Sequence, residues 1–123
     1  MARILVIDDD DDIRNVLLLM LKASGHEVIT AVNGAEGLKA FNTQPADVVL
    51  TDLLLPDQDG LEIIKQLRRI SPKVGIIAMS GESGANTVLA AAERAGVGIL
   101  AKPFFPDQLL AAVDNALLQS QHV

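Results

Sequence analysis

Several residue types are missing or scarce in this chain of 123 residues, and each absence excludes a class of function. Without cysteine, there can be no disulfide framework and no thiolate metal site. Tyrosine and tryptophan are absent and phenylalanine occurs three times, so few side chains could stack on nucleic-acid bases. Ten lysines and arginines stand against 16 aspartates and glutamates. The resulting net charge of -6 disfavours direct binding to nucleic acid.

Long apolar runs are also missing. No stretch approaches the roughly 18 residues of a membrane span, and the first residues lack the layout of a secretory signal. We therefore expect a cytoplasmic protein without membrane insertion. The chain length and an apolar fraction of 50% suit a single domain with its own core. We place this domain at residues 1–119, followed by a short C-terminal tail at residues 120–123.

Short apolar runs alternate with amphipathic segments along the whole chain. Runs rich in β-branched residues predict five strands, at about residues 4–7, 26–31, 48–52, 74–79 and 97–101. Apolar residues at spacings of three and four predict helices at about residues 11–23, 61–70 and 106–118. Turn and stop residues, together with alanine-rich sequence in the later segment, predict two more at about residues 35–42 and 85–95. Strict alternation of strand and helix implies an α/β fold with a parallel sheet and helices on both faces.

Polar residues stand at the ends of four of these strands. Asp8 and Asp9 follow the first, Asp52 ends the third, Ser80 follows the fourth and Lys102 follows the fifth. The carboxyl ends of parallel strands share one edge, so these side chains are expected to converge there. Neighbouring carboxylates repel one another unless a proton or a cation joins them, and an all-oxygen ligand set suits Mg²⁺. Such a pocket meets the requirements for forming an aspartyl phosphate.

Four pieces of sequence resemble the receiver domains of two-component response regulators. They are ILVIDD at the first strand, DVVLTDLLLPDQDG at the third, AMSG at the fourth and AKPF at the fifth. Their spacing is 44 residues from Asp8 to Asp52, 28 more to Ser80 and 22 more to Lys102. The resemblance covers essentially the whole chain. It implies a flavodoxin-like, doubly wound sheet of five strands in the order 2-1-3-4-5, flanked by five helices.

The same resemblance implies a role for each pocket residue. Asp52 would be the phosphoacceptor, while Lys102 and Ser80 would contact the phosphoryl group. The Mg²⁺ ligands would be Asp8, Asp9, Asp52 and the backbone carbonyl of Leu54. A sensor histidine kinase or a phosphotransfer protein would supply the phosphoryl group. The output would be altered binding of a downstream protein or output domain, so the chain would not be a turnover enzyme.

Two further features belong to this comparison with receiver domains. The Lys102-Pro103 bond resembles the cis peptide of the family, a geometry that is accessible mainly before proline. Ile99, three residues before Lys102, stands where many receivers carry an aromatic residue that moves inward on activation. The usual coupled movement of Ser80 and an aromatic side chain therefore lacks its aromatic partner in this chain.

Other functions stay open at this point. A pseudo-receiver, or scaffold, would bind partners without phosphorylation, and Ile99 leaves room for it. The spacing of Asp8 and Asp10 is similar to the nucleophile loop of haloacid-dehalogenase-like phosphatases, but Asp12 replaces the threonine or valine expected there. The chain could also be the N-terminal domain of a longer regulator with a DNA-binding or enzymatic output.

Overall fold

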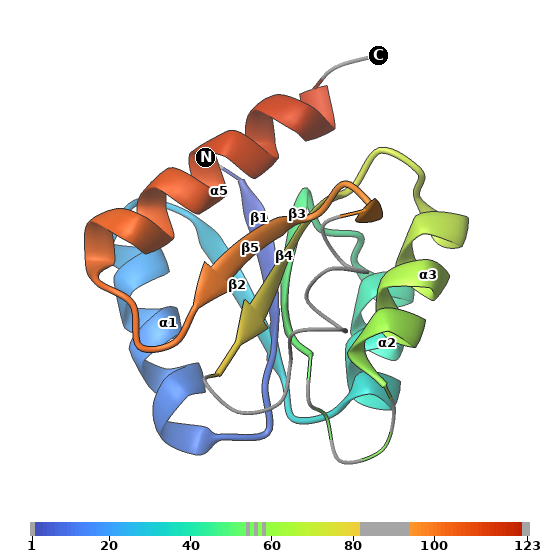
Figure 1. Ribbon diagram of the computed structural model, residues 1–123, viewed down its shortest axis with the longest axis horizontal. Helices are drawn as coiled ribbons and strands as arrows, with labels where there is room; N and C mark the ends of the chain where they lie inside the picture. Colours follow the sequence, from blue (N-terminus) through green and yellow to red (C-terminus); the bar gives the residue numbers. More distant parts are fainter. Residues whose placement is uncertain (1, 54, 56, 58, 82–93, 122–123) are drawn as a thin grey trace.

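The computed structural model describes residues 2–53, 55, 57, 59–81 and 94–121 (Figure 1). These residues form five strands and four helices. In chain order they are β1 (Arg3–Ile7), α1 (Asp11–Ala23), β2 (Glu27–Ala31), α2 (Gly34–Thr43), β3 (Val48–Asp52), α3 (Gly60–Ile70), β4 (Gly75–Ser80), β5 (Gly98–Ala101) and α5 (Pro106–Gln121).

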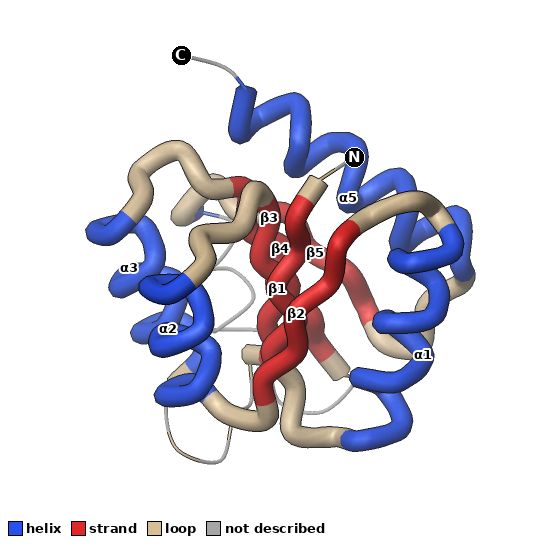
Figure 2. The backbone as a smooth tube through the Cα atoms, turned by 180° about the vertical axis from the view of Figure 1, so that it is seen from behind, coloured by secondary structure: helices blue, strands red, loops and turns tan. Residues whose placement is uncertain are grey.

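The five strands form one parallel sheet in the order β2-β1-β3-β4-β5, which confirms the expected flavodoxin-like arrangement. Helices α1 and α5 cover one face of the sheet, and α2 and α3 cover the other (Figure 2). The described residues contain four helices, not the five that were predicted. The helix predicted at about residues 85–95 falls mostly on residues 82–93, which lie outside the described part of the chain.

The sheet separates two hydrophobic clusters, because successive side chains of a strand point to opposite faces. The cluster under α2 and α3 includes Leu5, Ile7, Val49, Phe41, Ile63, Ile64 and Leu67. The cluster under α1 and α5 includes Ile4, Val6, Leu50, Leu17, Leu21, Leu109 and Val113. Burying one such aliphatic or aromatic side chain contributes about 1.5–3 kcal/mol. Strands β1 and β3 serve both clusters, which explains their uninterrupted apolar runs, Ile4–Ile7 in β1 and Val48–Leu50 in β3.

The C-terminal helix is longer than the sequence pattern predicted. Helix α5 continues to Gln121, past the expected end of the domain at residue 119. The division of the chain into a domain and a tail at that point stays a prediction. None of the helices in the described ranges combines the length and the apolar character that a bilayer crossing requires.

Gly75, the first residue of β4, lies directly against α5. A Cβ atom added there would lie 2.5 Å from the carbonyl oxygen of Ala116 in α5. Gly98, the first residue of β5, is a matched control, because the nearest atoms to its added Cβ lie 3.7 Å away.

We expect Gly75→Ala to destabilise the fold by about 1–3 kcal/mol, the usual cost of overpacking a core. Gly98→Ala should change stability by no more than about 0.5 kcal/mol. Urea denaturation of the two variants measures this difference. Equal stability of both variants would show that α5 moves aside without cost.

Candidate functional site

The carboxyl edge of the sheet carries the residues that the sequence pattern singled out. Asp8 lies one residue beyond β1, Asp52 and Ser80 are the last residues of β3 and β4, and Lys102 lies one residue beyond β5. Parallel strands end on the same side, so the topology brings these four positions together. Asp9, next to Asp8, completes the group.

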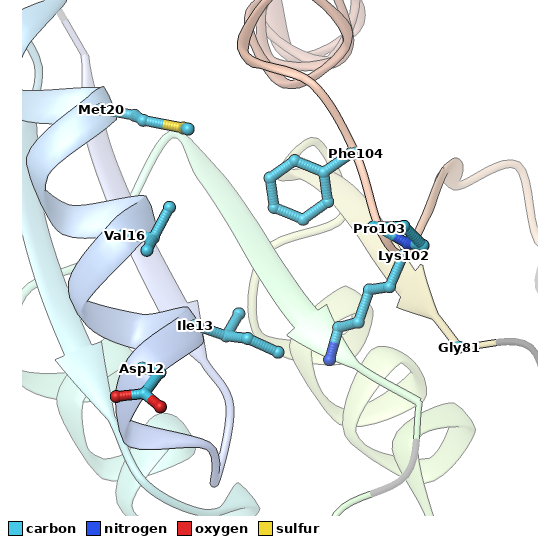
Figure 3. A pocket seen from close by; sticks show the side chains of 8 residues that line it. All are labelled: Asp12, Ile13, Val16, Met20, Gly81, Lys102, Pro103 and Phe104. Carbon is cyan, nitrogen blue, oxygen red and sulfur yellow. The ribbon is translucent and has the colours of Figure 1, made fainter.

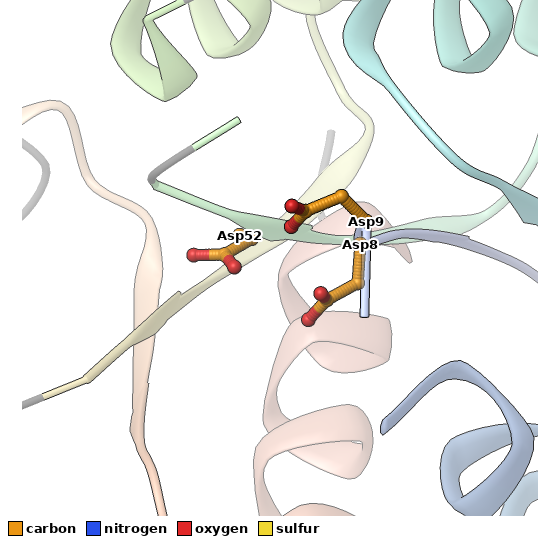
Figure 4. A group of neighbouring side chains, drawn as sticks. All are labelled: Asp8, Asp9 and Asp52. Atoms are coloured by element: carbon orange, nitrogen blue, oxygen red, sulfur yellow. The ribbon is translucent and has the colours of Figure 1, made fainter. Parts of the chain in front are cut away.

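Three carboxylates lie next to one another at this edge (Figure 4). One oxygen atom from each of Asp8, Asp9 and Asp52 can be chosen so that all three lie within 4.8 Å of one another. Asp8 is fully buried and Asp52 is 8% exposed, whereas Asp9 is exposed. Two buried carboxylates at this separation repel each other, so they require a nearby positive charge or the uptake of a proton.

Lys102 supplies positive charge to both buried carboxylates. Its Nζ donates to Asp8 Oδ2 at 2.9 Å and to Asp52 Oδ2 at 3.1 Å. Its backbone N–H donates to the Ser80 carbonyl at 2.7 Å, which continues the pairing of β5 with β4 beyond the last strand residue. The Lys102-Pro103 peptide bond is cis, which confirms the expectation from the sequence.

The ionisation of this cluster follows from burial and from the lysine. Burial raises the pKa of Asp8, although hydrogen bonds from the Asp10 N–H and from Lys102 act in the opposite direction. Burial also lowers the pKa of Lys102, but its hydrogen bonds and charge interactions with Asp8 and Asp52 outweigh that effect and raise it overall. Lys102 is therefore a permanent cation at neutral pH, whereas ionising Asp8 has a cost in free energy.

The other predicted site residues have these positions. Ser80 is 7% exposed, and its Oγ donates to the neighbouring Gly81 carbonyl at 3.2 Å. Ile99 is partly buried and packs against the cluster under α2 and α3. Leu54, whose carbonyl was predicted as a metal ligand, lies outside the described residues. The roles of all these residues stay predictions.

Two contacts at this edge were not anticipated from the sequence. Arg14 in α1 donates from Nη1 to the Asp8 carbonyl at 2.9 Å. Asp57 accepts from the Gly34 and Ala35 N–H groups at 2.9 and 3.0 Å, so it caps α2 as well as lying in the loop before α3. An arginine near a helix start and an aspartate in a turn are common residues. Nothing in the local pattern therefore indicates these longer-range partners.

An apolar pocket lies beside Lys102, between α1 and the segment that follows β5 (Figure 3). Its volume is about 490 Å³. The lining residues are Asp12, Ile13, Val16, Met20, Gly81, Lys102, Pro103 and Phe104. The pocket therefore places apolar surface next to the only predicted site residue that carries a positive charge.

The convergence of three carboxylates and a lysine on a 2-1-3-4-5 sheet can now be compared with known proteins. The sequence model for "Response regulator receiver domain" matches residues 4–114. The chain belongs to this family. The receiver domain from Clostridium thermocellum has a similar structure, with a TM-score of 0.91, 33% sequence identity and 98% of each chain covered.

Curated relatives of this receiver domain are longer regulators. The transcriptional regulatory protein GlrR of Escherichia coli (strain K12) is 33% identical over 119 residues, which cover 97% of this chain and 27% of GlrR. The DNA-binding transcriptional regulator NtrC of Azospirillum brasilense is 39% identical over 116 residues, which cover 94% of this chain and 24% of NtrC. The chain thus spans about a quarter of the length of these relatives. These matches support neither a haloacid-dehalogenase-like phosphatase nor a phosphorylation-independent scaffold.

A double-mutant cycle can measure how strongly Lys102 and Asp8 depend on each other. The Lys102 side chain is 17% exposed and that of Asp8 is fully buried, so solvent screens this pair little. The pair Arg3 and Glu27 is a control within the same chain, with side chains 35% and 56% exposed.

We expect Lys102→Met and Asp8→Asn to show a coupling energy of about 1–3 kcal/mol in metal-free buffer, within the range of contacting buried groups. The Arg3 and Glu27 cycle should give about 0.2–1 kcal/mol, as exposed ion pairs do. Denaturant unfolding of the variants provides both values. A coupling at the Lys102 pair no larger than at the surface pair would contradict this view of the site.

Proposed function

We propose that this receiver domain accepts a phosphoryl group on Asp52 and that the modification changes the binding of a partner protein. The observation that supports this most directly is the contact of Lys102 Nζ with both Asp52 Oδ2 and Asp8 Oδ2. A lysine bound to the acceptor carboxylate stands where negative charge develops during phosphoryl transfer. Receiver domains of response regulators are phosphoacceptors, so the chemistry agrees with the family.

In the proposed reaction, an Asp52 carboxylate oxygen attacks the phosphorus atom of a phosphohistidine. A bond forms between this oxygen and phosphorus while the phosphorus–nitrogen bond of the donor breaks. The electron pair of the broken bond stays on the imidazole, which takes up a proton. Lys102 exchanges its contact with the Asp52 carboxylate for one with a phosphoryl oxygen. The product is an acyl phosphate at the edge of the sheet.

The carboxylates of Asp8, Asp9 and Asp52 have the chemistry of a magnesium site. Mg²⁺ prefers oxygen ligands at about 2.0–2.1 Å in an octahedron, so opposite ligands lie about 4.2 Å apart. Neighbouring ligands in such an octahedron lie about 2.9 Å apart. The three carboxylate oxygen atoms, which lie within 4.8 Å of one another, would therefore draw closer around a bound ion. When bound, the ion would neutralise charge on the phosphoryl oxygens. The Leu54 carbonyl is a further proposed ligand.

Ser80 provides a link between the modified site and β4. In the structure its hydroxyl donates to the Gly81 carbonyl, a bond that it can exchange for one with a phosphoryl oxygen. That exchange would pull on the end of β4 and bias the domain toward a second conformation. Ile99 is an aliphatic side chain in the neighbouring strand, so we propose that the response here does not use an inward-moving aromatic residue.

The proposed partners are of two kinds. A sensor histidine kinase or a phosphotransfer protein would donate the phosphoryl group, and the apolar pocket next to Lys102 offers such a protein a surface to contact. A downstream protein or an output domain would read the change, in line with the regulators that this chain resembles. We assign these functions to a receiver domain at residues 1–119, since the family match extends to residue 114.

Phosphorylation by a small-molecule donor tests the acceptor assignment. We expect acetyl phosphate with Mg²⁺ to add one phosphoryl group to the purified protein, as read by intact mass. Asp52→Asn should remain unmodified, because an amide is not a nucleophile of comparable strength. Asp114→Asn removes an equal charge from the exposed surface of α5 and should be modified like the parent. Modification of Asp52→Asn to the same extent would refute the assignment.

Thermal unfolding tests the metal site independently of phosphorylation. At a Mg²⁺ concentration about 100 times the dissociation constant, the folded state should gain about 2.7 kcal/mol. The melting temperature of the parent should therefore rise, and Asp9→Asn should abolish most of this rise. Asp12→Asn, an exposed change in the first turn of α1, serves as the control and should preserve the rise. If Asp9→Asn responds to Mg²⁺ like the parent, Asp9 is not a ligand.

A further inference from the structure

Arg14 connects the first turn of α1 to the segment that carries two of the three clustered carboxylates. Its side chain is 15% exposed, and its Nη1 donates to the Asp8 carbonyl at 2.9 Å. The other end of the guanidinium, Nη2, pairs with Asp11. Because both ends of the planar guanidinium are engaged, the side chain is held in one orientation.

The carbonyl that Arg14 contacts belongs to the turn between β1 and α1. Asp8 is the first residue beyond β1, where the chain leaves the sheet and turns toward α1. Its carboxylate Oδ1 accepts from the Asp10 N–H at 2.9 Å, and its own N–H donates to the Ala31 carbonyl at 3.2 Å. Asp10 in turn caps α1 by accepting from the Asp12 and Ile13 N–H groups. Hydrogen bonds thus hold both ends of this turn, with Asp9 between them.

Asp9 differs from its neighbours because it is exposed and yet lies in the carboxylate cluster. Within the described part of the chain, the Asp9 carboxylate forms no hydrogen bond or ion pair that would fix its direction. Its direction therefore depends on the backbone of residues 8–10. Outer contacts that orient metal ligands in this way are commonly worth a tenfold or larger change in affinity.

We propose that Arg14 is a positioning residue for the divalent cation. By holding the Asp8 carbonyl, it fixes the turn after β1 so that the Asp8 and Asp9 carboxylates point to a common centre. This inference rests on the proposed function, because it concerns the same metal site. Arg14 touches the main chain of Asp8 and not the acceptor Asp52, so it acts on the cation affinity rather than on the transfer step.

Charge and positioning predict opposite effects of removing this arginine. If only charge mattered, loss of a cation near three carboxylates would strengthen Mg²⁺ binding. If Arg14 positions the turn, its loss would weaken binding, because the ligands must be ordered when the cation arrives. The sign of the change therefore separates the two explanations.

The test is calorimetric titration of the whole chain with MgCl₂, alongside thermal unfolding of each variant without metal. We expect Arg14→Met to raise the dissociation constant for Mg²⁺ about tenfold. Arg14→Lys should fall between Arg14→Met and the parent, because lysine keeps the charge and one possible donor. Asp12→Asn, an exposed change in the same helical turn, leaves both contacts of Arg14 in place and should bind Mg²⁺ nearly as the parent does. At saturating Mg²⁺, Arg14→Met should accept phosphate from acetyl phosphate at nearly the parent rate.

Several results would overturn the proposal. Binding by Arg14→Met that is equal to or tighter than that of the parent would show that charge, not positioning, dominates. A lowered melting temperature with an unchanged dissociation constant would show a purely structural role. If Arg14→Met does not fold, Arg14→Lys decides the matter by the same criterion. A parent protein that binds no Mg²⁺ would overturn the proposed function, and this inference with it.

Discussion

The repulsion between two buried carboxylates is the constraint on which this structure depends. Asp8 and Asp52 lie at the ends of neighbouring central strands, so the fold itself forces them together. Lys102 reaches both from the edge strand and offsets much of the repulsion. The repulsion that remains matters for function, because it leaves the pocket with unbalanced negative charge. A pocket with unbalanced negative charge favours the uptake of a cation, which agrees with the proposed metal site and with the proposed phosphorylation of Asp52.

Much of the fold could be predicted from the sequence because the signals are local. Buried strands appear in the sequence as short apolar runs. Strand β1 is followed directly by Asp8, and β3 ends at Asp52. Parallel topology then places those strand ends together without any knowledge of side-chain positions. The residues of the carboxylate and lysine cluster could be predicted from the sequence for this reason. Their observed convergence follows from where each stands relative to a strand end.

Contacts between loops could not be predicted in the same way. The bonds from Arg14 to the Asp8 carbonyl and from α2 to Asp57 depend on the path of a turn through space. Periodicity carries no information about such paths, because a turn has no repeating pattern. Strand and helix boundaries also shifted by a residue or more, as with α5, whose final turns lack a stop signal in the sequence. Sequence thus indicated which residues meet, whereas the structure was needed to see what orients them.

The division of the core by the sheet has a consequence for how this domain can vary in evolution. Leu5 and Ile7 belong to one cluster, and Ile4 and Val6 to the other. An inserted or deleted residue within β1 would exchange these two sets and would also turn Asp8 away from its present direction. A single length change there would damage core and site together. Loops at the amino edge of the sheet affect neither the strand register of the core nor the direction of Asp8. Insertions and deletions should therefore accumulate in those loops.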